Sequence, residues 1–414
     1  MSRKKNNLLT LFCIIFIDLV GVGILIPVLA PLFLDPSATI VPATWTESTR
    51  NIALGFLIAA YPLAQFFGSP ILGTLSDKYG RKKLLSLSLV GTIFGYLLFA
   101  VGLLTGQLWL LYLSRILDGF TGGNIGVANS AISDMSTPET RTKNFGLVGM
   151  AFGLGFIIGP FLGGILADSH VVSWFSSATP FWFAAGLATV NLLLVEFAFE
   201  ETLKKSVAKK IHALIGFTHL AKAVRMQKMR SIFIVIFLHS LGFCFFTQFF
   251  PVFLVQKFHF QEASIGAMFG YIGLWIAFCQ GFVTRVVSKH FSPEKVLRIS
   301  MFGLSTTLFL ITLSGNVAIL YLIQPLMAVF EGLNFPNETS IVAKLSTEDD
   351  QGEAMGIIQS LRALGQAVPP IIAGFLVSVD QNLPTYTAAV LILLAWAVFM
   401  ISFRPKPKHA SARR

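Results

Sequence analysis

Six ionisable side chains deep inside long apolar stretches of this sequence stand out, because a charge is costly there. They are Asp18, Arg115, Asp118, His239, Glu331 and Arg362. An ionisable residue within a membrane-spanning segment is a functional candidate by default. Because burial favours the neutral carboxylic acid and a nearby arginine favours the carboxylate, such groups can take up and release a proton as their access to water changes. We therefore predict a role in proton coupling. The simpler alternative for each residue is an ion pair that only joins two helices.

These candidates differ in the role that we expect of them. Asp18 and Glu331 lie deep within their apolar stretches, and they are the residues predicted to carry a transported proton. Arg115 and Asp118 are three residues apart, so they share one helical face and can partly neutralise each other. His239 is interpreted as a polar residue of a cavity rather than as the main proton site.

The composition indicates that membrane helices position these residues. Of the 414 residues, 54% are hydrophobic and 12% are charged, whereas soluble domains have roughly 25% charged residues. A hydrocarbon core needs about 20 apolar helical residues. Sufficient stretches lie at 8–33, 51–74, 84–104, 108–134, 143–168, 179–199, 230–256, 263–289, 294–314, 317–345, 351–379 and 384–404. The prediction is an all-α membrane protein with twelve transmembrane helices.

The 31 Lys and Arg residues behind the net charge of +11 are unevenly distributed between the two sides of the predicted membrane. Arg50 and Lys257 lie on one side and Arg115 and Arg362 lie within stretches, while the other Lys and Arg residues lie on or beside the connections of the side that holds both termini. This is the positive-inside pattern, so we predict cytoplasmic termini and no binding of nucleic acid. The apolar run after Asn7 is too long for a signal peptide. A bacterial inner membrane is the expected location.

An internal repeat divides the chain into two halves of six stretches each. The segment from Ser136 to Leu166 matches the segment from Ser346 to Leu376. The matched positions include Gly146 with Gly356, Gly155 with Gly365, Pro160 with Pro370 and Gly164 with Gly374. A looser match pairs the segment around Asp18 with the segment around His239. We predict six-helix bundles at 1–199 and 230–404, joined by a basic cytoplasmic linker at 200–229 and followed by a cytoplasmic tail at 405–414.

Four motifs follow one another along the first half. They are Asp18-Leu-Val-Gly21-Val-Gly23-Ile-Leu-Ile-Pro27, Gly73-Thr-Leu-Ser-Asp77-Lys-Tyr-Gly80-Arg81-Lys82-Lys83, Tyr112-Leu-Ser-Arg115-Ile-Leu-Asp118-Gly119 and Gly153-Leu-Gly155-Phe-Ile-Ile-Gly159-Pro160-Phe-Leu-Gly163-Gly164. The second resembles the loop signature of the major facilitator superfamily. The others resemble the first-, fourth- and fifth-helix motifs of its twelve-helix drug:proton antiporters, and the run from Asp18 to Glu201 is most similar to the tetracycline-resistance exporter branch. The resemblance implies the major facilitator fold, and it implies proton handling by Arg115.

The resemblance also implies a gate at the loop between the second and third stretches. Glycine permits a tight turn at Gly73 and Gly80, and Asp77 and Arg81 can bond to neighbouring helix ends. Asp134 resembles the family carboxylate that pairs with the loop arginine. We therefore predict an Arg81–Asp134 ion pair that acts as a gate latch. The alternative is a basic loop that only sets topology.

A glycine face marks the fifth stretch. Gly155, Gly159 and Gly163 recur every four residues, so another helix can approach closely along that face. Pro160 lacks a backbone N–H and should kink the helix. We predict a hinge on which the two halves rock. Tight packing alone is the alternative.

The second half departs from the tetracycline-exporter pattern. Those exporters typically have an acidic residue in the ninth helix, whereas the ninth stretch here has only Glu294 and Arg298, at its inner end, and Glu331 lies in the tenth. This departure puts tetracycline itself in doubt as the cargo. If the stretches line up with the family, the candidate cargo-binding residues are Asn124, Phe243, Phe246, Gln248, Gln324 and Asn334. Interhelical hydrogen bonds are the alternative reading of the polar members.

The missing motifs narrow the function. The sequence has no G-x-x-x-x-G-K-[ST] nucleotide site and no H-E-x-x-H metal site, so we expect neither a primary pump nor an enzyme, and no metal or cofactor besides the coupling proton. The three cysteines lie within apolar stretches and imply no disulfide framework. The prediction is a monomeric antiporter that exports a small amphipathic compound across a lipid bilayer. The alternatives are a proton-coupled transporter of a nutrient, sugar or siderophore, and a solute sensor that transports nothing.

Overall fold

The computed structural model describes residues 2–35, 39–136, 138–203, 222–346 and 351–403, and every regular element in these ranges is helical. The predicted all-α class is confirmed. Ten helical segments of the described chain are long and apolar enough to cross a membrane. Two further crossings are made by α5 with α6 and by α7, which completes the predicted twelve. We number these crossings as spans one to twelve along the chain.

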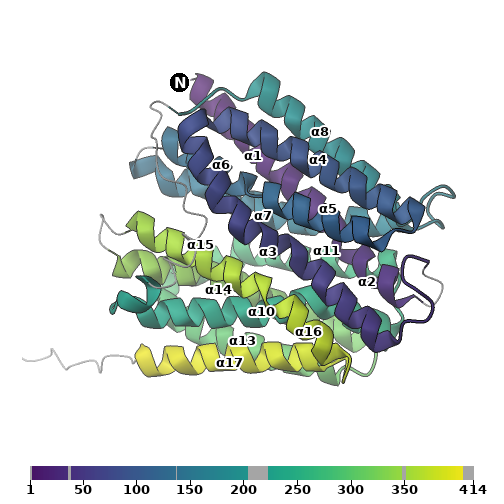
Figure 1. Cartoon of the computed structure of the whole chain (residues 1–414). Coiled ribbons are helices and arrows are strands. Elements are labelled where there is room, and N and C mark those ends of the chain that lie inside the picture. The colour runs from purple at the N-terminus through teal and green to yellow at the C-terminus, as the bar shows by residue number, and fades with distance from the viewer. Residues whose placement is uncertain (1, 36–38, 137, 204–221, 347–350, 404–414) are drawn as a thin grey trace, which may run out of the picture.

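Each half of the chain forms one group of helices, the first above the second in Figure 1. The first half contains α1 (Ser2–Ile24), α2 (Ile26–Leu34), α3 (Glu47–Tyr79), α4 (Arg81–Thr105), α5 (Leu108–Thr121), α6 (Asn124–Met135), α7 (Pro138–Ala167) and α8 (Thr179–Ala198). The second contains α10 (Arg230–Phe258), α11 (Glu262–Phe278), η1 (Cys279–Val283), α12 (Thr284–His290), α13 (Pro293–Leu313), α14 (Val317–Leu345), α15 (Gln351–Ala367), α16 (Pro369–Val377) and α17 (Leu383–Ser402).

The start of α1 and the end of α17 lie at the same end of the bundle (Figure 1). We call this the terminal end, and the other the opposite end. Most of the predicted linker, residues 204–221, and the tail at 405–414 lie outside the described residues. The domain boundaries therefore stay predictions.

Several spans that the sequence predicted as single helices are broken. In span one, α2 begins at Ile26 with a proline in its first turn, and α16 of span eleven begins with two prolines. Proline has no N–H for the preceding turn, so it favours a helix start. Span four is broken at Gly122–Gly123, and span eight contains the π-helical turn η1. These breaks lie within the membrane-crossing region, where non-helical backbone needs protein or a cavity beside it.

The glycine face of span five packs on span one of the same half. A Cβ atom placed on Gly155, Gly159 or Gly163 would meet Leu19, Gly23 or Ile24 of α1, respectively. The close approach predicted for this face is present. The contact between the halves uses a different position on α7, because Gly164 lies against Gly266 of α11. Rocking about this helix stays a prediction.

The repeat found in the sequence reappears as repeated contacts. Gly155 packs on Leu19 of span one, and its partner in the repeat, Gly365, packs on Ser240 and Leu241 of span seven. The contacts between the halves are repeated as well, as shown by two glycine pairs at the opposite end of the bundle. These pairs are Gly164 of α7 with Gly266 of α11, and Gly374 of α16 with Gly55 of α3.

A Gly159→Ala substitution tests the approach of α7 to α1. Its Cβ atom would meet backbone atoms of Val20 and Gly23, so the helices must separate, and overpacking of this kind costs about 1–3 kcal/mol. We expect the thermal unfolding midpoint of the purified protein to fall by several degrees. Gly186→Ala in α8 is the matched control, since no atom of the described chain lies within 4 Å of its added Cβ. An equal fall in both variants would contradict the packing argument.

Candidate functional site

The first buried centre joins spans one and four through Asp18. This residue is 8% exposed, and its Oδ1 accepts a hydrogen bond of 2.9 Å from Nδ2 of Asn124. Asn124 is the first residue of α6, so the break in span four places its amide beside α1. The other amide atom, Asn124 Oδ1, is buried and finds no hydrogen-bond partner within the described residues. The predicted proton residue and a predicted cargo residue therefore meet in one contact.

Arg115 and Asp118 form the ion pair that their spacing predicts. The Arg115 Nη1 and Asp118 Oδ2 atoms are 3.3 Å apart on α5, and both residues are buried. The guanidinium also lies over the ring of Tyr61 in α3, with its carbon 4.5 Å from the ring centroid. A cation above an aromatic face gains electrostatic energy that partly offsets lost hydration. The role of this pair in proton handling stays a prediction.

The second buried centre surrounds His239 of span seven. Its Nε2 lies 2.9 Å from Oε2 of Glu331, and its Nδ1 lies 2.6 Å from Oε1 of Glu338. The second oxygen of Glu338 accepts a hydrogen bond of 2.9 Å from Nη2 of Arg362. Three helices, α10, α14 and α15, thus contribute to one charged cluster. Three of the predicted proton residues, His239, Glu331 and Arg362, belong to it.

The two centres occupy equivalent places in the repeat. The looser match already pairs Asp18 with His239, and the register that aligns Gly155 with Gly365 also aligns Asn124 with Asn334. In the second half, Nδ2 of Asn334 is 3.4 Å from Nε2 of His239. Each half therefore brings an asparagine amide of span four or ten to an ionisable residue of span one or seven.

Glu338 was not predicted from the sequence. It lies seven residues after Glu331, which is about two helical turns, so both carboxylates project from the same face of α14. That spacing was the available signal. The side chain is 1% exposed and is bonded on both oxygens.

The remaining predicted cargo residues lie in the second half. Phe243 and Phe246 continue a row of aromatic rings along α10 from His239, with centroid separations of 6.2 and 6.1 Å. Gln248 is half-buried on the same helix. Gln324 of α14 is fully buried, and neither amide atom has a hydrogen-bond partner in the described part of the chain. Cargo binding by any of these residues stays a prediction.

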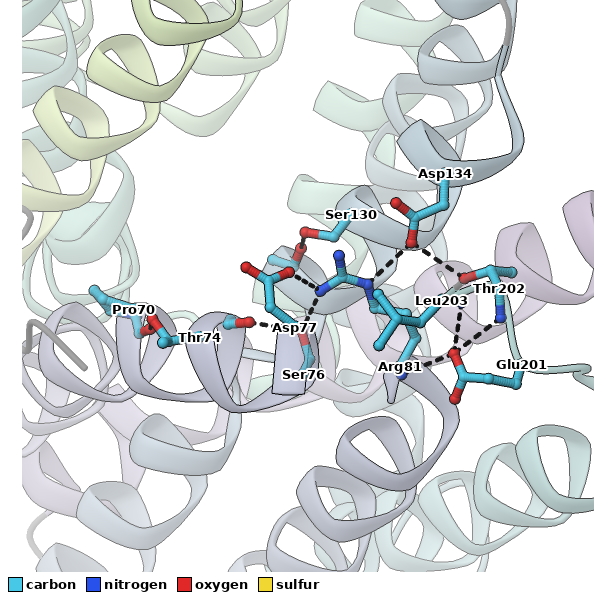
Figure 2. A network of polar contacts seen from close by, with 12 residues as sticks. Pro70, Thr74, Ser76, Asp77, Arg81, Ser130, Asp134, Glu201, Thr202 and Leu203 are labelled. Atoms are coloured by element: carbon cyan, nitrogen blue, oxygen red, sulfur yellow. Dashed lines mark hydrogen bonds and ion pairs between the residues drawn. The ribbon is translucent and has the colours of Figure 1, made fainter. Parts of the chain in front are cut away.

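The predicted gate residues converge on Arg81 at the terminal end of the first half (Figure 2). The Arg81 side chain lies 2.6 Å from Asp77 and 3.0 Å from Asp134, and it donates a hydrogen bond to Ser76. The ion pair with Asp134 is therefore present, and its action as a latch stays a prediction. The tight turn predicted at Gly73 is wrong, because α3 continues through this residue to Tyr79 and the Gly73 carbonyl accepts a hydrogen bond from Ser76 within the helix.

A carboxylate from outside the motif completes this network. Glu201, which follows α8, accepts hydrogen bonds from the backbone N–H groups of Arg81 and Lys82 at 3.0 and 3.1 Å. These are the first two N–H groups of α4, which have no partner within the helix. Gly80 before them has a φ of 103°, and a Cβ there would meet the Glu201 carboxylate. The glycine of the motif thus admits a cap from a distant segment.

The sequence profile of the Major Facilitator Superfamily matches residues 11–323 and 232–414. The chain belongs to this superfamily. A tetracycline resistance protein, class H, of Pasteurella multocida is 30% identical over 388 residues, which cover 90% of each chain. Multidrug resistance protein 1 of Bacillus subtilis is 28% identical over 99% of this chain and 100% of its own. The resemblance of the motifs to the drug:proton antiporters and their tetracycline-resistance branch is confirmed.

Solved structures show the same fold. The human organic anion transporter MFSD10 aligns with a TM-score of 0.73 and 23% identity over 96% of this chain and 99% of its own. A D-xylose-proton symporter aligns with a TM-score of 0.75 and 16% identity over 98% of each chain. At these identities the likeness shows the fold alone. The chain is a multi-pass membrane transporter of this superfamily, and it is not an enzyme.

A Glu201→Ala substitution tests the distant cap of α4. It leaves the first N–H groups of the helix without their acceptor, and the loss of a helix cap costs about 0.5–2 kcal/mol. We expect a lower thermal unfolding midpoint for the purified protein. The unfolding midpoint of Glu201→Gln should lie between those of the wild type and the alanine variant. Glutamine keeps an acceptor but not the negative charge that is favourable at a helix N-terminus. An unchanged midpoint in the alanine variant would rule out the cap.

Proposed function

We propose that this transporter is a proton-coupled antiporter that exports a small amphipathic compound. The carrying observation is the pair of buried ionisable centres at Asp18 and His239, one in each half and at equivalent points of the repeat. Groups that change charge when a proton binds are costly to bury in a membrane, and their retention favours a role in the transport cycle. The proton is the coupling ion, and no other cofactor is proposed.

The contacts between the halves support alternating access. Besides the glycine pairs, Nε2 of Gln256 in α10 donates hydrogen bonds to Glu47 and Asn51 of α3, at 2.8 and 3.4 Å. The hydroxyl of Ser378, the residue after α16, donates a hydrogen bond of 3.4 Å to the Ser48 carbonyl of α3. All of these contacts lie at the opposite end. The described conformation is thus fastened at that end, and a cycle of alternating access requires the fastening to open.

The orientation follows from charge. The terminal end is proposed to be cytoplasmic, because the basic connections lie there and membrane proteins keep their Lys and Arg on that side. A bacterial inner membrane is the proposed location. Cargo would then enter between the halves from the cytoplasm and leave through the fastened end. We propose a monomer embedded in lipid, with no nucleic-acid partner.

The chemistry beside His239 supports an amphipathic cargo. Phe243, Phe246 and Phe250 form a row of rings along α10, and the last two have centroids 4.7 Å apart. Gln324, whose amide has no hydrogen-bond partner among the described residues, adds a polar group in the same half. Pockets for small molecules combine apolar walls with a few polar groups. Tetracycline and multidrug resistance proteins among the relatives support the same class of compound.

Everted membrane vesicles test the coupling. Adding tetracycline, ethidium or other members of an amphipathic panel to acidified vesicles should dissipate the pH gradient, because each imported molecule releases protons. Asp18→Asn keeps the shape of the side chain but cannot ionise. We expect it to abolish gradient-driven uptake and to preserve counterflow exchange of the same compound.

Asp168→Asn is the matched control, because Asp168 is an exposed-loop carboxylate bonded to His170. If no compound of the panel dissipates the pH gradient, drug antiport is contradicted. Growth of cells on a sole nutrient that requires this protein would point instead to an importer. Loss of both transport modes in Asp18→Asn would mean that the residue serves binding or folding.

A cysteine pair at Ser48 and Ser378 tests whether the fastened end must open. A disulfide or short thiol cross-link between α3 and α16 should hold the halves together there, and we expect transport to stop and to return on reduction. Each variant with only one of the two introduced cysteines should transport normally under the same oxidation. Unimpaired transport with the cross-link formed would refute opening at this seam.

A further inference from the structure

Glu338 is the most enclosed member of the charged cluster around His239. Its side chain is 1% exposed, whereas the Glu331 side chain is 15% exposed. One Glu338 oxygen faces the imidazole Nδ1 and the other accepts from Arg362. With both oxygens engaged, this carboxylate has no free face for cargo or for water. Glu338 is therefore unsuited to direct contact with cargo or with water.

The two imidazole nitrogens have different surroundings. Nδ1 faces the Glu338 carboxylate, which accepts a hydrogen bond, so the hydrogen on Nδ1 is favoured. Nε2 has the Glu331 carboxylate at 2.9 Å and the Asn334 amide nitrogen at 3.4 Å. An acceptor and a donor are thus both within reach, and Nε2 has a partner whether or not it carries a hydrogen. The hydrogen bond at one nitrogen of a histidine fixes the state of the other.

We propose that Glu338 is a positioning residue, which holds His239 so that Nε2 exchanges a proton with Glu331. In the forward step the O–H bond of protonated Glu331 breaks and an N–H bond forms at Nε2. This leaves a Glu331 carboxylate and an imidazolium whose Nδ1–H remains hydrogen-bonded to the Glu338 carboxylate. The reverse step returns the proton to Glu331, the more exposed group. The inference rests on the proposed proton coupling.

The charged groups facing His239 come from two helices. Glu331 and Glu338 belong to α14, and Arg362 of α15 lies behind Glu338. The neutral Asn334 is itself held by a hydrogen bond of 2.6 Å from Ser300 of α13. A purely structural alternative exists, in which Glu338 only pins α14 to its neighbours. The two readings differ in whether Glu338 acts through His239.

A double-mutant cycle separates these readings. Glu338→Gln, His239→Asn and the double variant are compared for gradient-driven uptake of ethidium and of tetracycline into everted vesicles. Loss of a carboxylate that orients a functional histidine costs about 10–100-fold in metal sites, and we expect a loss of at least about tenfold here. Counterflow should persist, and the double variant should be no worse than His239→Asn. The proposal is overturned if the losses of the two single variants multiply in the double variant. It is also overturned if counterflow falls as much as gradient-driven uptake.

Glu294→Gln is the matched control. It removes a carboxylate from an ion pair of 2.8 Å with Lys344, which likewise joins α14 to a neighbouring helix, here α13, but with a lysine that is 66% exposed. We expect gradient-driven uptake close to that of the wild type. A tenfold loss in this control would show that any broken ion pair of the second half has the same effect, and it would overturn the assignment to Glu338.

A second measurement needs no transported compound. It separates positioning from pinning even if the wild type transports neither ethidium nor tetracycline. The thermal unfolding midpoint of each purified variant is followed from about pH 5.5 to 8.5, across the range in which histidine titrates. Positioning predicts that Glu338→Gln changes the shape of this profile, and that it does not do so in the His239→Asn background. A uniform fall at every pH in both backgrounds would show pinning only. If uptake by the wild type does not depend on the pH gradient, the proposed antiport itself is wrong.

Discussion

A group that carries charge inside a membrane must find its bonding partners in the protein, because hydrocarbon offers none. Both halves of this transporter meet that constraint in the same way. Asp18 is bonded by the amide of Asn124, and His239 lies beside the amide of Asn334. Amides suit this position because they offer a donor and an acceptor without adding charge. A carboxylate in one half and an imidazole in the other can therefore each change protonation state beside an asparagine amide.

Close helix contacts make this arrangement possible. Lipid provides no hydrophobic drive for helices to associate, so small residues that let backbones approach supply the packing energy. Gly155 brings α7 against Leu19, the residue next to Asp18, and Gly365 brings α15 against Ser240, the residue next to His239. The repeated glycine positions thus set the depth and spacing of both ionisable centres. A Cβ at either glycine would displace the helix that carries the centre.

The sequence predicted the class, the spans and most members of both centres, because charges and glycines in apolar runs are conspicuous. It predicted that another helix approaches the α7 glycine face without identifying that helix, and the structure shows it to be α1 of the same half. It missed Glu338 because the signal in the sequence was only its spacing of seven residues from Glu331, and that spacing identifies no partner on another helix. It missed Glu201 because a cap contributed from 120 residues away has no local pattern. Contacts between distant segments depend on helix packing, which periodicity alone does not define.

The repeat also explains why the two halves differ at the terminal end. The register that pairs Asn124 with Asn334 pairs Asp134 with Lys344. In the first half, Asp134 holds Arg81 at the start of span three, and in the second Lys344 holds Glu294 at the start of span nine. The ion pair is thus kept with its charges reversed.

Its surroundings are not kept. Arg81 is buried and is bonded to Asp77 and Ser76 as well, while Lys344 is 66% exposed. Exposed ion pairs contribute about 0–1 kcal/mol, because water screens them and ordering the side chains costs entropy. Of these two ion pairs, the one in the first half is therefore the stronger contact between helix ends. In exchange, the second half concentrates charge at mid-membrane, where three ionisable residues, Glu331, Glu338 and Arg362, surround His239. Duplication supplied one scaffold, and the buried charges then diverged within it.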